Sequence, residues 1–114
     1  MTQQLSDRRD VRFVLFDQLN IDELTQSRLF GDLNRKTFDM VLTEARSLAI
    51  KEILPTAVIS DREGCTFENG SVKLPSEIHR VYDLIKKGEW IALSDDLDAG
   101  GQGMPLTLWS AAME

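Results

Sequence analysis

The sequence contains one cysteine, Cys65, and one histidine, His79. A single cysteine cannot form an intrachain disulfide and leaves no second thiolate for a zinc site or a redox pair, so we expect a reducing compartment. A single histidine excludes a multi-histidine metal site and a histidine dyad. We therefore interpret Cys65 as a structural or incidental thiol and His79 as a surface or packing residue, and we predict no metal site.

Basic residues are too few for a nucleic-acid-binding protein. Thirteen Lys and Arg stand against 19 Asp and Glu, which leaves a formal net charge of −6. A phosphate backbone needs clustered cations, so we expect no nucleic-acid partner. The acidic excess lies in residues 61–114, with five basic against ten acidic side chains. We interpret it as a solvated surface.

Long apolar runs are absent as well. No run reaches the roughly 18 residues that a membrane span requires, so we expect a soluble, cytoplasmic protein. At 114 residues, with 42% apolar and 28% charged residues, the composition is that of one globular domain. A chain of this length buries a modest core and leaves little room for a cofactor cleft.

The apolar pattern predicts a first helix that Ser6 or Asp7 caps. The segment Arg12–Phe16 is also compatible locally with a strand, but its charged opening turn and its length favour a helix. A second helical segment follows, with Asn20 or Asp22 as its cap. We expect the first buried face to comprise Val11, Val14, Leu15 and Leu19, widened by Phe13 and Phe16, and the second segment to run through Leu24, Leu29 and Phe30 to Gly31.

The third predicted helix has the strongest pattern. Asn34 or Thr37 can cap it, and Pro55 should end or kink it because proline removes a backbone donor. We expect the helix to resume as far as Asp61. Its apolar stripe comprises Phe38, Val41, Leu42, Ala45, Leu48, Ala49 and Ile53.

The remaining chain predicts a hairpin turn and two further helices. Asn69 and Gly70 suit a two-residue turn between Phe67 and Val72. Pro75 suits the first position of a fourth helix, which Gly88 terminates, and a last helix begins near Pro105. The fourth helix should bury Ile78, Val81, Tyr82 and Ile85. The predicted fold class is therefore all-α, an orthogonal or up-down bundle of four to six helices.

The stretch from Trp90 to Pro105 is the most informative segment. Three glycines within four residues indicate positive φ angles or close contact with another segment, as in a turn that positions the next helix. The run lacks the spacing of a dinucleotide or phosphate loop, and the aspartates before it lack the spacing of an EF-hand. Both tryptophans are interpreted as core or interface residues. The turn residues are Trp90, Gly100, Gly101, Gln102, Gly103 and Pro105.

The order of features along the chain resembles the N-terminal helical domain of the acyl-CoA dehydrogenase family. Within that family, it is most similar to the subgroup that includes methylmercaptopropionyl-CoA dehydrogenase. One departure is Glu89, where many relatives have glycine, and another is Asp95–Asp98. The resemblance rests on Phe13–Asp17, Pro55, Asp61–Cys65, Asn69–Val72, Pro75, Tyr82, Trp90, Leu93–Ser94, Gly100–Gly103, Pro105 and Glu114.

The resemblance implies an FAD-dependent enzyme that oxidises acyl-CoA to trans-2-enoyl-CoA and passes electrons to an acceptor. It implies a homo-oligomer in which the catalytic glutamate and most flavin contacts lie in a middle β-domain and a C-terminal helical domain. We therefore expect this chain to be a truncated N-terminal domain, 1–114, that helps to form the acyl-CoA pocket and is inactive alone. The resemblance therefore assigns no catalytic, cofactor-binding or substrate-binding role to any residue of this chain. The alternative is a free-standing helical interaction module descended from such a domain.

Overall fold

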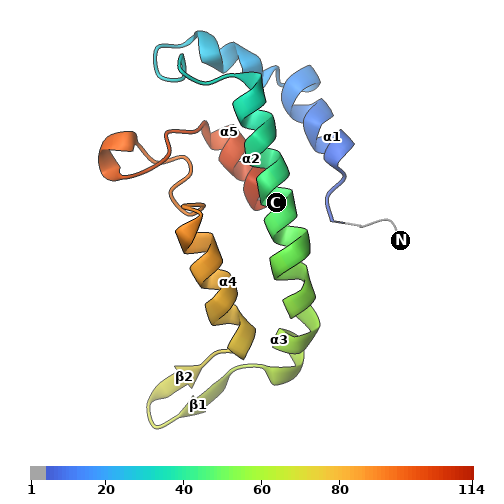
Figure 1. The fold of residues 1–114 in the computed structure, drawn as a ribbon, viewed down its shortest axis with the longest axis vertical. Helices are drawn as coiled ribbons and strands as arrows, with labels where there is room; N and C mark the ends of the chain where they lie inside the picture. The colour runs from blue at the N-terminus through green and yellow to red at the C-terminus, as the bar shows by residue number, and fades with distance from the viewer. Residues whose placement is uncertain (1–4) are drawn as a thin grey trace. The chain divides into compact units, whose positions relative to one another are not determined.

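The computed structural model describes residues 5–114, and 63% of these are helical, which agrees with the expected all-α class. Short π-helical or 3-10 segments extend or link several of the α-helices. Among the described residues, no helix has the length and apolar character that a membrane crossing requires. The helices are α1 (Arg8–Arg12), α2 (Arg35–Leu48), α3 (Ala57–Glu63), α4 (Ser76–Lys87) and α5 (Leu106–Met113), and the strands are β1 (Thr66–Glu68) and β2 (Ser71–Lys73) (Figure 1).

The chain divides into two compact units. The terminal unit comprises the residues up to Arg46 together with Ala92–Glu114, and the central unit comprises Ser47–Ile91. The boundary near Arg46 falls within α2. Each unit is described separately below.

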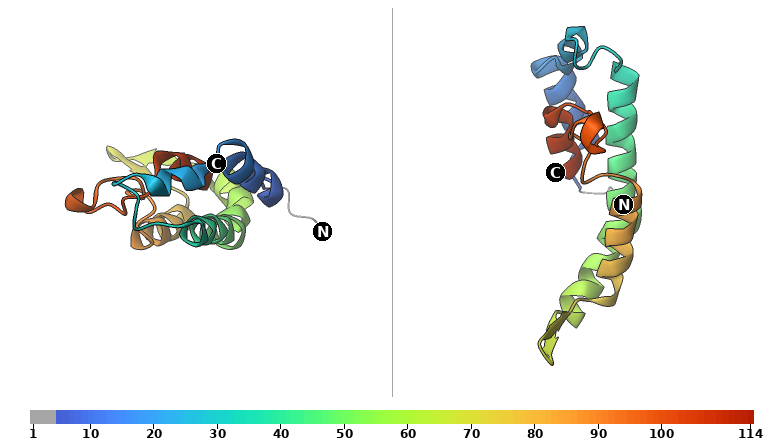
Figure 2. Two further views of the ribbon diagram at one scale, coloured as in Figure 1. Left: turned by 90° about the horizontal axis from the view of Figure 1, so that it is seen from above. Right: turned by 90° about the vertical axis from the view of Figure 1, so that its left-hand side faces the viewer.

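In the terminal unit, α1 runs antiparallel to α2. Arg8, at the start of α1, donates a hydrogen bond to the Thr43 hydroxyl at 3.1 Å, and Arg12, at its end, forms an ion pair with Asp39. Helix α5 lies beside α1 in both views of Figure 2. The buried apolar side chains of this unit are Leu15, Phe16, Ile21, Phe38, Val41, Leu93, Pro105 and Leu108.

The first helix is confirmed, but its buried face differs from the prediction. Asp7 caps it by accepting a hydrogen bond from the Arg9 N–H at 2.8 Å. After Arg12 the helix continues as a π-helix, Phe13–Gln18, in which the Leu19 N–H reaches back five residues. Because a π-turn contains an extra residue, the apolar stripe loses its α-helical phase. Leu15 and Phe16 are buried, whereas the predicted face residues Phe13, Val14 and Leu19 are exposed.

The second helical segment is shorter than predicted. It is a 3-10 helix, Ile21–Gln26, and it ends before Phe30 because Ser27 adopts an extended conformation. The predicted cap Asn20 has a φ of 51° and provides no side-chain cap; its amide instead donates a hydrogen bond to the Glu23 carboxylate at 2.7 Å. Leu29, which the prediction placed within the helix, lies beyond its end and is exposed.

The long third helix follows the prediction closely. Asn34 caps α2 by accepting a hydrogen bond from the Thr37 N–H at 3.0 Å, and Phe38 and Val41 are buried. Ile53, the last residue of the predicted stripe, is exposed, because the helix changes from α to π geometry at Ala49 and the stripe loses its phase. Pro55 lies in a 3-10 turn, Leu54–Thr56, that follows a π-helical segment, Ala49–Ile53. The helix then resumes as α3 and ends at Glu63, two residues beyond the predicted end.

In the central unit, the predicted hairpin joins α3 to α4 at one end of the helix pair (Figure 2). Phe67 pairs with Val72, and Asn69 and Gly70 have φ angles of 50° and 76°, as a type I′ turn requires. Pro75 precedes the first residue of α4, as predicted to within one residue. Val81 is buried, but the predicted stripe residue Tyr82 is exposed and packs beneath the Lys86 ammonium at 5.6 Å. The amphipathic carbon stem of lysine suits such a surface contact.

Candidate functional site

Residues 92–105 form a closed loop ahead of α5. The Gln102 N–H donates a hydrogen bond to the Ala92 carbonyl at 3.0 Å, and the Met104 N–H donates to the Leu93 carbonyl at 3.0 Å. These two bonds hold the ends of the loop side by side. Leu93 is buried between them, so the loop is anchored to the core of the terminal unit.

The three glycines of this loop have the positive φ angles and the close contact that their spacing predicts. Gly100 has a φ of 86° and Gly103 a φ of 65°. Gly101 is buried, and a Cβ atom there would overlap the backbone carbonyl of Asp95. A residue with a side chain is disfavoured at Gly100 and Gly103 because of the positive φ angle. At Gly101 it is disfavoured because there is no space for a Cβ atom.

The end of the loop positions α5. Pro105 is fully buried and immediately precedes the helix, and Gln102 is half-buried. Leu108, one turn into α5, has no exposed surface. The turn therefore sets the point at which the last helix enters the core.

Trp90, the remaining turn residue of the sequence prediction, lies in the central unit at the end of α4. Its N–H donates to the Ile85 carbonyl at 3.2 Å, and the Glu89 N–H donates to the Lys86 carbonyl at 3.1 Å. These bonds form a Schellman motif, in which the residue after the C-cap adopts a left-handed conformation. That residue is Glu89, with a φ of 59°, whereas the predicted terminator Gly88 keeps a helical φ of −78°. Gly88 is needed for another reason, since a Cβ there would lie 2.6 Å from the Trp90 Nε1 atom.

Replacing Glu89 with glycine should raise the free energy of unfolding by about 1 kcal/mol, because glycine adopts a left-handed conformation without steric cost. Urea denaturation followed by circular dichroism measures the change. The control is Lys87→Gly, which places glycine within α4 and should lower the free energy of unfolding by about 1 kcal/mol. A loss of stability in Glu89→Gly would contradict the prediction.

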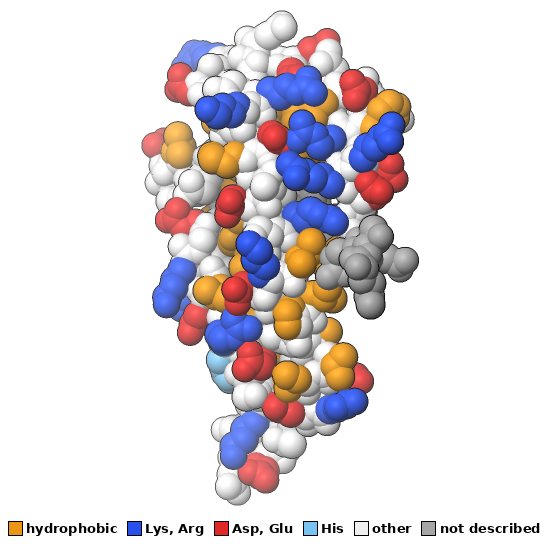
Figure 3. Space-filling model, turned by 45° about the vertical axis from the view of Figure 1, so that its right-hand side comes forward, with side chains coloured by type: hydrophobic (Ala, Val, Ile, Leu, Met, Phe, Trp, Pro, Cys, Tyr) orange, Lys and Arg blue, Asp and Glu red, His pale blue; other side chains and the backbone are white. Residues whose placement is uncertain are grey.

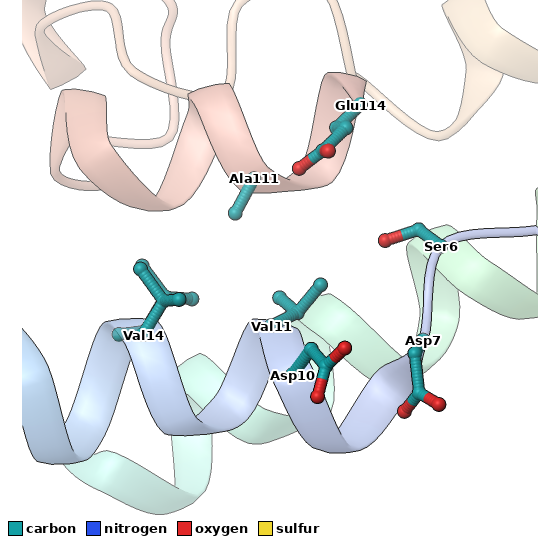
Figure 4. A pocket seen from close by; sticks show the side chains of 8 residues that line it. Ser6, Asp7, Asp10, Val11, Val14, Ala111 and Glu114 are labelled. Carbon is teal, nitrogen blue, oxygen red and sulfur yellow. The ribbon is translucent and has the colours of Figure 1, made fainter.

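A groove with an apolar floor lies between α1 and α5 within the terminal unit. Figure 4 shows Val11 and Val14 projecting toward Ala111 of α5 across a cavity of about 300 Å³. Carboxylates of Asp10 and Glu114 lie at its margin. The full lining comprises Ser6, Asp7, Asp10, Val11, Val14, Leu15, Ala111 and Glu114.

The groove contains no arrangement that supports catalysis. Its only hydroxyl, on Ser6, has no histidine or lysine beside it among the lining residues, so no activated nucleophile is formed. His79 and Cys65 are exposed in the central unit. No group of three potential metal ligands occurs within residues 5–114. The apolar side chains of the groove suit contact with an apolar group, and carboxylates border them.

Helix α5 is apolar on most of its surface, although the terminal unit buries only part of it. Leu106 and Met113 are exposed, whereas Leu108 is buried. The indole Nε1 of Trp109 is buried and has no hydrogen-bond partner within the described chain. A buried unpaired N–H costs about 1–3 kcal/mol, and a helix with apolar residues on several sides is typical of one that is covered on several sides. This partly covered helix was not predicted, because the sequence only indicated where it begins.

No established family model matches the sequence. The chain is similar to 3-methylmercaptopropionyl-CoA dehydrogenase of Ruegeria pomeroyi, with 27% identity over 106 residues. The matched region is 93% of this chain but 18% of that dehydrogenase, so the chain spans a small part of the length of its relative. The chain is thus a distant and partial relative of a dehydrogenase.

Proposed function

We propose that this chain is the N-terminal helical domain of an FAD-dependent acyl-CoA dehydrogenase, most similar to the methylmercaptopropionyl-CoA dehydrogenase subgroup. The observation that carries the proposal is the match to a dehydrogenase along 93% of the chain. The proposed parent enzyme oxidises an acyl-CoA to a trans-2-enoyl-CoA, and FAD, when bound, would accept the hydride. The electron acceptor and a second copy of the enzyme are its proposed partners.

The geometry of α5 supports the same proposal. The exposed side chains of Leu106 and Met113, and the unpaired Trp109 N–H, suit a helix that other parts of a larger protein and an acyl chain cover. The glycine loop sets the position of this helix. The role of the chain in the enzyme is then to fix α5 as one wall of the acyl pocket.

The proposal assigns the catalytic base and the flavin contacts to parts of the enzyme other than these 114 residues. In this proposal the carboxylates of the groove between α1 and α5, Asp10 and Glu114 among them, have no part in proton abstraction. In the proposed enzyme, the residues of this chain position α5, contact the acyl chain and exclude water from it. They move no proton in the proposed reaction.

A flavin titration tests the proposal. The 114-residue chain is compared with a polypeptide that continues through the downstream reading frame of its gene. We expect the longer polypeptide to be yellow, to retain FAD on gel filtration, and to bleach when acyl-CoA is added without an electron acceptor. We expect the 114-residue chain to remain colourless.

Two results would contradict the proposal. One is a reading frame that closes after Glu114, and the other is a longer polypeptide that folds but binds no FAD. Either result would favour the alternative function, a free-standing helical interaction module. A matched control is Leu106→Ala in the longer polypeptide, since Leu106 is exposed and its loss should change the acyl-CoA affinity rather than FAD retention.

A further inference from the structure

The terminal unit carries a second, larger hollow beside α1, with a volume of about 610 Å³. Although the whole chain is acidic, this lining contains more basic than acidic side chains. Figure 3 shows Lys and Arg side chains gathered on the upper part of the face in view. The lining residues are Arg8, Arg9, Arg12, Arg35, Asp7, Asp17 and Phe13.

Two of these arginines are held in place before any ligand arrives. The guanidinium carbons of Arg12 and Arg35 lie 5.6 Å and 4.3 Å from the centre of the buried Phe16 ring. Arg12 also pairs with Asp39, and Arg35 pairs with Asp22 at 3.2 Å. Stacking and ion pairing fix both side chains and offset their mutual repulsion. Both guanidinium groups are therefore held in defined positions beside the hollow.

The hollow also offers donors that the protein does not use. A guanidinium has five N–H groups, so the single contacts of Arg12 and Arg35 leave several of them available. The Arg9 backbone N–H donates to Asp7, but its guanidinium group forms no hydrogen bond or ion pair with other residues of the range 5–114. Planar guanidinium groups bind phosphate oxygens in pairs, which makes a cluster of this kind suited to a diphosphate.

The other lining residues suit a nucleoside rather than an inorganic anion. The Phe13 side chain is 58% exposed, which leaves ring surface available to stack on a planar base. Asp17 is exposed, and its carboxylate can accept hydrogen bonds from sugar hydroxyls. A volume of about 610 Å³ is within the usual range for a small-molecule site.

We propose that the arginine-lined hollow beside α1 binds a nucleoside diphosphate group, with the phosphates on Arg9, Arg12 and Arg35 and the base on Phe13. This site is separate from the groove between α1 and α5, and the inference does not depend on the proposed dehydrogenase function. The exposed location predicts that binding weakens as the ionic strength rises.

Calorimetric titration of the 114-residue chain tests the site with ADP, adenosine, pyrophosphate and CoA as probes. We expect ADP to bind more tightly than adenosine and more tightly than pyrophosphate. Arg9→Gln should weaken ADP binding by about fivefold, since one charge-assisted contact is lost. Phe13→Ala should weaken ADP binding by at least about fivefold and leave pyrophosphate unchanged. The matched control Arg28→Gln removes an exposed arginine outside the hollow and should leave ADP binding unchanged.

The absence of ADP binding would overturn the proposal, as would equal losses in the Arg9 and Arg28 variants. Pyrophosphate binding as tight as that of ADP would overturn the assignment to a nucleoside. The CoA titration distinguishes two sources of the same group. Binding of CoA at least as tight as that of ADP assigns the hollow to the nucleotide end of a CoA ester, and binding of ADP alone assigns it to a free nucleotide.

Discussion

Replacing Gly101 with alanine should lower the free energy of unfolding by about 3 kcal/mol, the upper part of the usual range for overpacking. The new Cβ would overlap the Asp95 carbonyl, which is backbone and cannot rotate away. Asp95 is itself held in the loop, because its carbonyl accepts a hydrogen bond from the Gly103 N–H at 2.9 Å. Relief of the overlap therefore requires the loop to open.

Two further glycines make this prediction specific. Gly100→Ala meets no atom within 4 Å but keeps a φ of 86°, so it should cost about 1 kcal/mol. Gly31→Ala has ordinary contacts and no positive φ, so its effect should be within about 0.5 kcal/mol of zero. Urea denaturation of the three variants should rank them in this order. Equal stabilities of the Gly101 and Gly31 variants would show that the loop does not close as described.

Replacing Leu108 with alanine should lower the free energy of unfolding by about 3–4 kcal/mol. Leu108 has no exposed surface, so its removal costs the transfer free energy of the side chain and leaves a cavity. The loss should also loosen α5, because Leu108 is the only fully buried side chain of that helix. Thermal and urea denaturation provide the measurement.

Leu106→Ala is the matched control, since it removes the same side chain from the same helix at a position that is 66% exposed. Its effect on the 114-residue chain should be within about 0.5 kcal/mol of zero. Similar losses in both variants would mean that α5 is not packed through the Leu108 side. In the proposed full-length enzyme, the Leu106 side should be covered, and Leu106→Ala should lower the affinity for acyl-CoA.

Local chemistry made several parts of the fold predictable. The Asn69–Gly70 turn, the Asn34 and Asp7 caps and the interruption at Pro55 each depend on a few neighbouring residues. Turn residues and caps act through their own backbone preferences and side-chain donors, which the sequence displays directly. The same reasoning identified the glycine loop before α5.

Packing decided the features that the prediction missed. The π-helix after Arg12 changes the helical phase, so Phe16 is buried while Phe13 and Val14 are exposed. The left-handed Glu89 was also unexpected, because glutamate does not favour that conformation. The only signal was its place directly after Gly88, where the resemblance has glycine. Neither feature follows from residue preferences alone.

The sequence determined where helices begin, where the chain turns and which residue types are available for chemistry, since these depend on local backbone preferences and composition. Only the tertiary structure decided which side chains come together. Arg9 and Arg35 are far apart in the chain and line one hollow because α1 packs antiparallel to α2. Val11 and Ala111 face each other because the glycine loop returns α5 to the first helix. Such contacts arise from burial and loop closure over long sequence separations, which no local pattern encodes.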